Sequence, residues 1–411
     1  MTASMCRDAD ARLAQLVSRH WQRSGDVTER LMQAGYTPDV PPDWNGVQRV
    51  PVRSKASLAE LQQHGAHLGG LVPAGVSAGA WFYSPGGVVE PLIERAVERL
   101  AEQLHAAGFH ASDRVLNGFA YHYTPAGVLF HEALRRIGAA VLPIGPLQVA
   151  MAAEFAARAS ATAFVGIASH LVLLLEQIDQ LPQNVARPRL RLALAGAEPF
   201  GDEARRRIER TWGTVCFDLY GTAESGIVAL ECAQHNGLHM HPDVLWEVLD
   251  PLDGTRVEPG RAGELVLTID SDELPLLRFG TGDLVRVETT PCACGSLAPR
   301  VLVQGRVGHS ARVRGMLLHA SQLRTFADRA GALAACRVTL QRADGRDTVV
   351  VAWRAASGCA PPAPQAFAEA FRDACRLRAD RFDEEHTLSP GSFELIDQRQ
   401  ATVVAEASAA P

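Results

Sequence analysis

Short apolar segments and helical segments alternate along the first half of the chain, and this alternation limits the fold more than any other feature of the sequence. The apolar segments have the length of buried strands, and helical patterns of about 10 to 15 residues separate them. The expected strands are Val115–Phe119, Ala139–Pro143, Ala163–Val165, Leu190–Ala195 and Val215–Leu219. The expected helices are Val89–Ala107, Ala126–Ile137, Met151–Ala159, Ser169–Leu181 and Asp202–Trp212. Strands joined by such helices pair in parallel, so the sequence predicts an α/β fold with βαβ sheets.

The pattern changes after residue 226. Short alternating runs divided by Pro, Gly and Asp predict a small β-rich subdomain over residues 227–304. After Gly305 a shorter unit begins, with two expected strands and a helix at Pro364–Arg378. Because 411 residues are too many for one ordinary core, we expect an N-terminal domain of residues 1–304 and a small α+β C-terminal domain of residues 305–411, joined by a hinge.

Composition excludes several classes of protein. A net charge of -6 argues against general nucleic-acid binding, which needs a basic face. No apolar stretch approaches the roughly 20 residues of a membrane span, and the first residues lack a signal-peptide core. We therefore expect a cytoplasmic protein with neither nucleic acid nor membrane as a partner.

Lysine is almost absent from the chain. Lys55 is the only one, and arginine supplies the rest of the positive charge. Any chemistry that needs a lysine ammonium therefore has a single candidate, near the N-terminus.

Four glycine-containing motifs follow one another in a fixed order. Residues 194–199 (LAGAEP) and 218–225 (DLYGTAES) each follow an expected strand, where a parallel sheet binds ligands and glycine lets the backbone approach them. Residues 277–284 (LRFGTGDL) place an Asp after a tight glycine turn, where it can accept hydrogen bonds from two ribose hydroxyls. Gly305 and Arg306 form a Gly-Arg pair at the domain boundary, which can act as a hinge with a phosphate-reaching guanidinium. Each motif alone is an ordinary turn, but their order and spacing are specific.

These four motifs resemble those of the adenylate-forming (acyl-activating) superfamily. Residues 117–146 and 232–242 are similar, more narrowly, to phenylacetate–coenzyme A ligases. The resemblance implies that Mg·ATP converts a carboxylic acid, aryl or arylacetyl, into an acyl adenylate. The acyl group then passes to the thiol of coenzyme A or of a pantetheine on an acyl carrier protein, while the C-terminal domain rotates about residues 305–310. Relatives are often dimers, so the resemblance also implies a homodimer.

The resemblance assigns roles to the matching residues. Tyr220 would stack on the adenine, Thr222 would meet the phosphate, and Glu224 would hold Mg²⁺. Asp283 would bind the ribose hydroxyls, and Arg306 would contact ribose or phosphate. The remaining nucleotide-binding positions are Gly196, Ala197, Glu198, Pro199 and Gly221. The residues expected near the acyl pocket are Tyr121, His122, Tyr123, Ser169 and His170.

The chain departs from the superfamily pattern at its phosphate-handling positions. The best match to the phosphate loop, Tyr83–Val88, is short and has neither Thr nor Lys, and an alternative at Gly75–Gly79 also lacks the lysine. Gly308 and His309 replace the acidic hinge residue. Arg399 stands where the catalytic lysine is expected; it keeps the charge but spreads it over a planar fork, so it is the candidate for a weaker catalytic cation.

Three interpretations of function therefore stay open. The first is an ATP-dependent acid–thiol ligase, which the retained Glu224, Asp283 and Arg306 favour. The second is a degenerate member that has lost adenylation and performs ATP-independent acyl transfer or condensation. The third is a non-catalytic partner in a biosynthetic pathway. The altered phosphate loop and the missing lysine favour the second and third.

A candidate metal site lies outside these motifs. Cys232, His239, Cys292 and Cys294 offer three thiolates and one imidazole, a set that suits tetrahedral Zn²⁺. A Cys-x-Cys pair is less diagnostic than Cys-x-x-Cys, and other histidines lie nearby, so free thiols remain the alternative. Four protein ligands leave no open position, so the predicted zinc is structural.

Overall fold

The computed structural model forms two compact units, Met1–Phe200 with Arg205–Gly305, and Gly201–Ala204 with Arg306–Pro411. The boundary between Gly305 and Arg306 falls at the expected hinge. The structure describes residues 3–63, 68–84, 87–146, 148–198, 200–251, 254–307, 310–314, 316–331, 333–343, 346–356 and 363–399.

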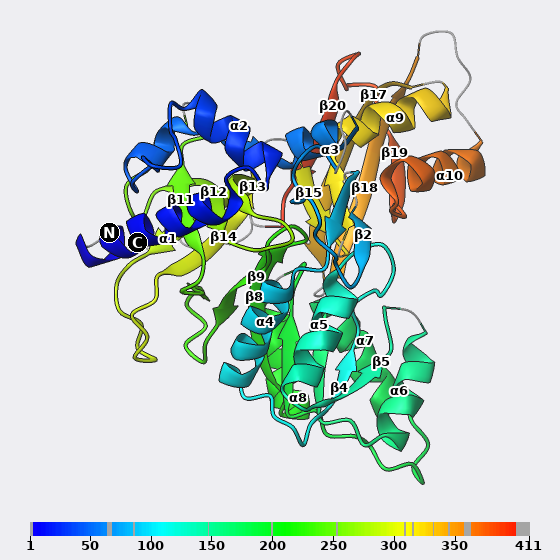
Figure 1. Ribbon diagram of the computed structural model, residues 1–411. Coiled ribbons are helices and arrows are strands. Elements are labelled where there is room, and N and C mark those ends of the chain that lie inside the picture. The colour runs from blue at the N-terminus through cyan, green and yellow to red at the C-terminus, as the bar shows by residue number, and fades with distance from the viewer. Residues whose placement is uncertain are drawn as a thin grey trace, which may run out of the picture. The chain divides into compact units, whose positions relative to one another are not determined.

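Five parallel strands form one half of a large sheet in the first unit (Figure 1). In the order of the sheet they are β5 (Ala140–Pro143), β4 (Arg114–Asn117), β6 (Ala163–Gly166), β7 (Leu192–Ala195) and β8 (Val215–Thr222). Helix α4 (Glu94–Ala106) precedes β4, and the helices between the five strands are α5 (Ala126–Arg136), α6 (Val149–Arg158), α7 (Ala168–Asp179) and α8 (Asp202–Trp212). The predicted α/β fold is confirmed. The strand at 140–143 is only partly buried, because it lies at the edge of the sheet.

Alternating side chains divide the core of this half between the two faces of the sheet. Leu192 and Leu194 pack in a cluster with residues of α4 and α5, whereas Ala193 and Ala195 pack in a second cluster with residues of α6, α7 and α8. This alternation is the two-residue period of a strand, and it shows that helices cover both faces.

The region expected as a separate β-rich subdomain instead continues the same sheet. Strand β8 pairs in parallel with β7 through Val215–Asp218 and antiparallel with β9 from Leu219 onward. The strands beyond it are β9 (Gly226–Glu231), β10 (Leu238–Met240), β14 (Arg300–Arg306), β13 (Leu276–Glu288), β12 (Ala262–Ile269) and β11 (Leu245–Leu249). The short strands predicted in this region are present, and β8 joins them to the parallel strands because it is long enough to pair on both sides.

The segments before α4 differ from the sequence prediction. Residues 88–91 form β3 (Val88–Pro91), which pairs with β2 (Trp81–Ser84), and the helix begins only at Glu94. Two valines and a proline favour a strand there over the first helical turn. Upstream lie α1 (Ala3–His20), α2 (Gly25–Gln33), β1 (Arg53–Ser54) and α3 (Lys55–Gln63).

The second unit has a four-stranded sheet, in the order β19–β18–β17–β20, and two helices. Its elements are β15 (Ser310–Val313), β16 (Met316–His319), α9 (Ala320–Ala330), β17 (Leu333–Ala343), β18 (Arg346–Ala355), α10 (Pro364–Cys375), β19 (Arg381–Glu384) and β20 (Phe393–Asp397). At its core the ring of Phe326 contacts those of Phe367 and Phe371, and the ring of Phe382 contacts the same two. The predicted α+β character of this part of the chain agrees with these elements.

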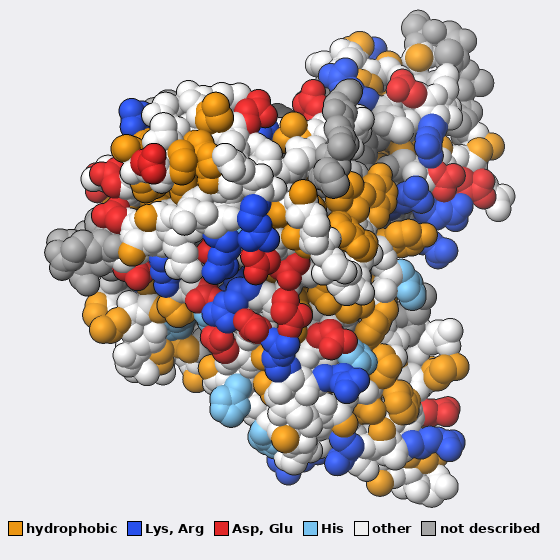
Figure 2. All heavy atoms as spheres, in the orientation of Figure 1, with side chains coloured by type: hydrophobic (Ala, Val, Ile, Leu, Met, Phe, Trp, Pro, Cys, Tyr) orange, Lys and Arg blue, Asp and Glu red, His pale blue; other side chains and the backbone are white. Residues whose placement is uncertain are grey.

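Among the described residues, no helix combines the length and the apolar character that crossing a membrane requires. On the face drawn in Figure 2, acidic and basic side chains are intermixed in one central patch.

Candidate nucleotide site and metal centre

The first two glycine motifs lie side by side at the carboxyl end of the parallel strands. Gly196 follows β7 and Gly221 lies near the end of β8, and the two strands pair with Ala195 opposite Asp218. A Cβ added to Gly196 would lie 2.3 Å from Leu219 Cδ1, so the close approach of the 196 loop to β8 requires glycine. Ala197 adopts a φ of +66°, a strained value for a residue with a side chain.

The third motif joins the same place through a direct hydrogen bond. Tyr220 donates its hydroxyl proton to Asp283 Oδ2 over 2.7 Å, and both side chains are buried. The residues expected to meet the adenine and the ribose are therefore in contact, and the three motifs around residues 196, 221 and 283 converge.

Asp283 is presented from the interior of a strand, whereas the sequence predicted a turn. Strand β13 runs unbroken through this motif, but Gly280 faces Val266 and Leu284 faces Glu264, so β13 has extra residues at this point. These extra residues form a bulge, in which the backbone N–H of Gly282 donates a hydrogen bond of 3.0 Å to Glu264 Oε1. A bulge re-aims side chains as a turn does, without ending the strand.

Glu224 forms a buried ion pair that the sequence did not predict. Its Oε1 lies 2.6 Å from Nζ of Lys55, and the same ammonium lies 4.0 Å from Oε1 of Glu90 on β3. Burial alone would raise the pKa of Glu224, but the charge of Lys55 lowers it below its usual value. Burial, together with the charge of Glu224, raises the pKa of Glu90 to about 8. At neutral pH, Glu224 is therefore ionised and Glu90 is largely protonated.

The loop that carries Glu224 is fixed from two sides. Thr222 and Ser225 exchange hydrogen bonds within the loop, including one of 3.2 Å from Ser225 N to Thr222 Oγ1. From α4, the buried guanidinium of Arg99 donates to Ile227 O over 2.8 Å and to Ser225 O. Burial lowers the pKa of Arg99 to about 10.

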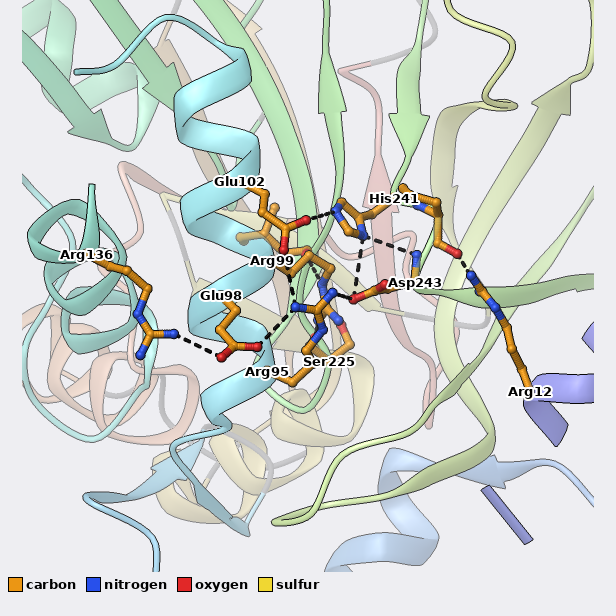
Figure 3. A network of polar contacts seen from close by, with 11 residues as sticks. Arg12, Arg95, Glu98, Arg99, Glu102, Arg136, Ser225, His241 and Asp243 are labelled. Carbon is orange, nitrogen blue, oxygen red and sulfur yellow. Dashed lines mark hydrogen bonds and ion pairs between the residues drawn. The ribbon is translucent and has the colours of Figure 1, made fainter. Parts of the chain in front are cut away.

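Ion pairs around Arg99 attach α4 to its neighbours (Figure 3). Arg95 pairs with Asp243, and Glu102 lies 3.2 Å from Nε2 of His241. On the other side Arg136 of α5 lies 3.3 Å from Glu98. Arg99 is thus a positioning residue held on a braced helix, and sequence reasoning missed it because one arginine on an amphipathic helix gives no signal.

The residues expected near the acyl pocket differ in burial and in their contacts. Ser169 donates its backbone N–H to Glu198 Oε1 over 2.6 Å, which ties α7 to the 196 loop. His170 is buried edge-on against Phe164, and burial lowers its pKa.

Farther along β4 and its loop, Tyr121 accepts a hydrogen bond of 2.8 Å from Nδ2 of Asn117. His122 is exposed, and the side chain of Tyr123 is 76% exposed. The assignment of these five residues to an acyl pocket therefore stays a prediction.

In the second unit, the guanidinium of Arg399 is already paired with two carboxylates. Its guanidinium donates to Asp397 through Nε (2.8 Å) and through a second nitrogen (2.5 Å), and to Asp347 Oδ2 over 2.6 Å. Two carboxylates therefore hold the cation that the sequence proposed for catalysis. Arg306 is the first residue of this unit's main segment. The remaining candidates Pro199, Gly308 and His309, and the tip of the phosphate loop at 85–86, lie outside the described residues.

The four predicted metal ligands come together in the first unit. The donor atoms of Cys232, His239, Cys292 and Cys294 all lie within 4.8 Å of one another. The sulfurs of Cys232 and Cys292 are 3.8 Å apart, and Cys294 Sγ lies 3.5 Å from His239 Nε2. Bond lengths of 2.3 Å to sulfur and 2.05 Å to nitrogen in a tetrahedron give separations of about 3.8 Å and about 3.6 Å. The donor set and its spacing therefore fit Zn²⁺.

The surroundings of this cluster favour His239 over its neighbours as the ligand. His239 Nδ1 lies 3.2 Å from Ala298 O, which leaves Nε2 facing the sulfurs. His235 instead lies 3.2 Å from Glu231, and His241 faces Glu102.

The sequence analysis named Lys55 only as the single candidate lysine, without a partner, and it missed Glu90. The signal for Lys55 was present, because it is the only lysine, but nothing in its position along the chain pointed to Glu224. Glu90 lies in an apolar strand directly after the shortened phosphate loop, where a charged residue is unexpected.

A parallel sheet with nucleotide motifs at its strand ends, continued by antiparallel strands and followed by a small α+β unit, defines the adenylate-forming fold. Comparison with known proteins confirms this class. Residues 147–270 match the family model described as AMP-binding enzyme. Among solved structures, 2-hydroxyisobutyryl-CoA ligase in complex with 2-HIB-AMP and CoA matches with a TM-score of 0.84 and 19% identity, over 99% of this chain and 92% of that chain. An amide bond synthetase from Marinactinospora thermotolerans matches with a TM-score of 0.59 and 16% identity, over 75% of this chain and 65% of that chain.

More narrowly, the chain resembles phenylacetate–coenzyme A ligases, as its sequence predicted. The enzyme of Escherichia coli is 29% identical over 54% of this chain and 52% of its own length. The enzyme of Pseudomonas putida is 30% identical over 46% of this chain and 44% of its own length. The enzyme of Thermus thermophilus is 25% identical over 76% of this chain and 73% of its own length. The chain thus spans about half the length of the first two relatives.

Proposed function

We propose that this protein is an acid–thiol ligase, which activates a carboxylic acid as an acyl adenylate and transfers the acyl group to a thiol. The observation that carries the proposal is the hydrogen bond between Tyr220 and Asp283, because it joins the two motifs expected to enclose the adenosine. The likeness to the coenzyme A ligases supports the reaction class. We further propose an aryl or arylacetyl acid, coenzyme A or a carrier-bound pantetheine as the thiol, and a homodimer.

Each group at the site has a role in this proposal. The loop at 196–198 and Tyr220 would bound the adenine, and Asp283 would accept the ribose hydroxyls. The resemblance also implies Mg²⁺ at Glu224. The Lys55 ammonium lies 2.6 Å from that carboxylate, so the residues as arranged do not leave Glu224 open to a metal ion. We therefore assign no step of the reaction to Mg²⁺.

Exchange of labelled pyrophosphate into ATP, measured with a panel of aryl acids, tests adenylation directly. We expect exchange with at least one acid, and its loss in Glu224→Gln and in Asp283→Ala. Glu154→Gln is the matched control, since that glutamate is exposed on α6. Exchange that survives unchanged in both site variants would refute the assignment of these residues.

A second candidate is acyl transfer without adenylation, and two observations favour it. Glu90 places a second carboxyl group beside the shortened phosphate loop, and Arg399 is held by two carboxylates. Under this alternative, AMP or coenzyme A raises the melting temperature while no acid supports exchange. No shift with any ligand would favour a non-catalytic partner.

We also propose that the Cys232, His239, Cys292 and Cys294 cluster binds one structural Zn²⁺. Cys232 directly follows β9, His239 lies on β10, and the two other cysteines lie between β13 and β14. The ion would fasten this end of the antiparallel strands together.

A further inference from the structure

We infer that Lys55 is the residue that binds the phosphate groups of the nucleotide, and that Glu224 and Glu90 hold its ammonium in place while the site is empty. The inference deepens the proposed function and rests on it for the identity of the nucleotide. It is carried by the position of one side chain among three motifs.

Backbone pairing brings Lys55 to the site. Strand β1 pairs in parallel with β13, with Ser54 opposite Gly280, so the chain enters α3 beside the strand that carries Asp283. Lys55 is the first residue of α3, and its side chain reaches Glu224 after β8 and Glu90 on β3. The start of α3, strand β3 and the 218–225 motif thus meet at one ammonium, and the residue before Lys55 pairs with β13.

The exposure of the three side chains gives the ammonium a route to a ligand. The side chains of Glu90 and Glu224 are each 1% exposed, whereas that of Lys55 is 25% exposed. The carboxyl groups are fixed in the interior, and the lysine covers them from the solvent side on a flexible stem. Rotation about the side-chain bonds of Lys55 would move its ammonium group without moving the backbone.

The charges around Lys55 also favour its role in phosphate binding. Among the described residues, Lys55 is the only basic side chain in ion-pair contact with Glu90 or Glu224. Phosphate oxygens brought to this edge would face two carboxyl groups unless the ammonium stood between them. A lysine is a compact charge that suits phosphate, and a hydrogen bond to an ionised group is stronger than a neutral one.

The shape of the phosphate hairpin explains why the charge must come from elsewhere. Ser84 of β2 pairs directly with Val88 of β3, so only three residues separate the two strands along the chain. This short stretch of sequence contains no basic residue that could bind a phosphate. The ammonium of Lys55 lies 4.0 Å from Glu90, on the strand that follows the stretch.

The single lysine makes the test direct. The full chain, labelled with ¹⁵N in lysine only, gives one side-chain Nζ signal, which Lys55→Met must abolish. The probes are ATP, AMP, inorganic tripolyphosphate and adenosine. We expect the signal to shift with ATP and tripolyphosphate and to stay in place with adenosine. A signal that does not move at saturating ATP, or that moves equally with adenosine, would overturn the inference.

Binding measurements on variants provide the second arm. Loss of one charge-assisted contact predicts that Lys55→Met weakens ATP binding about 10- to 100-fold, while adenosine binding is unchanged. Arg23→Met is the matched control, because it removes a half-exposed cation that pairs with Asp272. Because Lys55→Met leaves Glu224 unpaired in the interior, the double variant with Glu224→Gln shows whether any loss comes from misfolding. Equal loss for ATP and adenosine in that folded double variant would contradict the inference.

The two proposals fail in different ways. A shifted lysine signal without pyrophosphate exchange would preserve phosphate binding by Lys55 and reject adenylation. Exchange with an unshifted signal would do the reverse.

Discussion

Replacing Glu90 with glutamine should make the protein more stable at neutral and alkaline pH. Glu90 is completely buried, and its pKa in the folded protein is about 8, against a usual value of 4.5. A carboxyl group whose pKa is raised by folding favours the folded state below its usual pKa, and this contribution is lost as pH rises through about 8. Glutamine keeps the shape and removes the titration.

The size of the effect follows from the two pKa values. From these pKa values, the ionisation equilibrium of Glu90 lowers the free energy of unfolding by about 1 kcal/mol at pH 5.5 and by about 4 to 5 kcal/mol at pH 8.5, relative to a carboxyl group that stays protonated. The wild-type protein should therefore lose about 3 kcal/mol more than Glu90→Gln between these two pH values.

Urea unfolding at pH 5.5, 7.0 and 8.5 measures this difference. Five of the six tryptophans lie in the first unit, so tryptophan fluorescence follows mainly the unit that contains Glu90. Glu98→Gln is the matched control, because this exposed α4 carboxylate should leave the pH profile unchanged. If wild type and Glu90→Gln lose stability in parallel as pH rises, Glu90 is not the buried acid described here.

Three further changes test other parts of the structure. Purified protein should contain about one zinc per chain, and Cys292→Ser should lower that content in elemental analysis; a metal-free protein with unchanged stability would remove the metal centre. Arg205→Met should destabilise the protein by about 3–5 kcal/mol in urea unfolding, because it leaves the partly buried Asp218 and the buried Glu231 without their shared cation; a loss below about 1 kcal/mol would contradict that role. Tyr220→Phe should weaken AMP binding in calorimetry, since it removes the hydroxyl that orients Asp283; an unchanged affinity would mean that this hydrogen bond has no part in nucleotide binding.

The sequence predicted the parts of the fold that depend on local pattern. The alternation of strands and helices between residues 114 and 222, and the unit boundary after Gly305, follow from apolar periodicity and from glycine. The four metal candidates were also found, because cysteine and histidine are rare enough to stand out. The choice of His239 could not be made from spacing, since it depends on which ring faces Ala298.

The contacts between distant segments were beyond sequence reasoning. Lys55 and Glu224 are separated by most of the first unit, and only the pairing of β1 with β13 brings them together. The predicted turn at Asp283 was wrong for a similar reason, because the glycines there serve a bulge whose partner, Glu264, lies on another strand.

The place of the two adenosine-contacting candidates on strands has a consequence for how a ligand would be received. Tyr220 lies on β8 and Asp283 on β13, and both strands belong to one hydrogen-bonded sheet. Side chains on the strands of such a sheet keep their orientation when no ligand is bound. The conformational entropy lost on binding would then be mainly that of the nucleotide. The amide protons of both strands should therefore be equally protected from deuterium exchange with and without bound nucleotide.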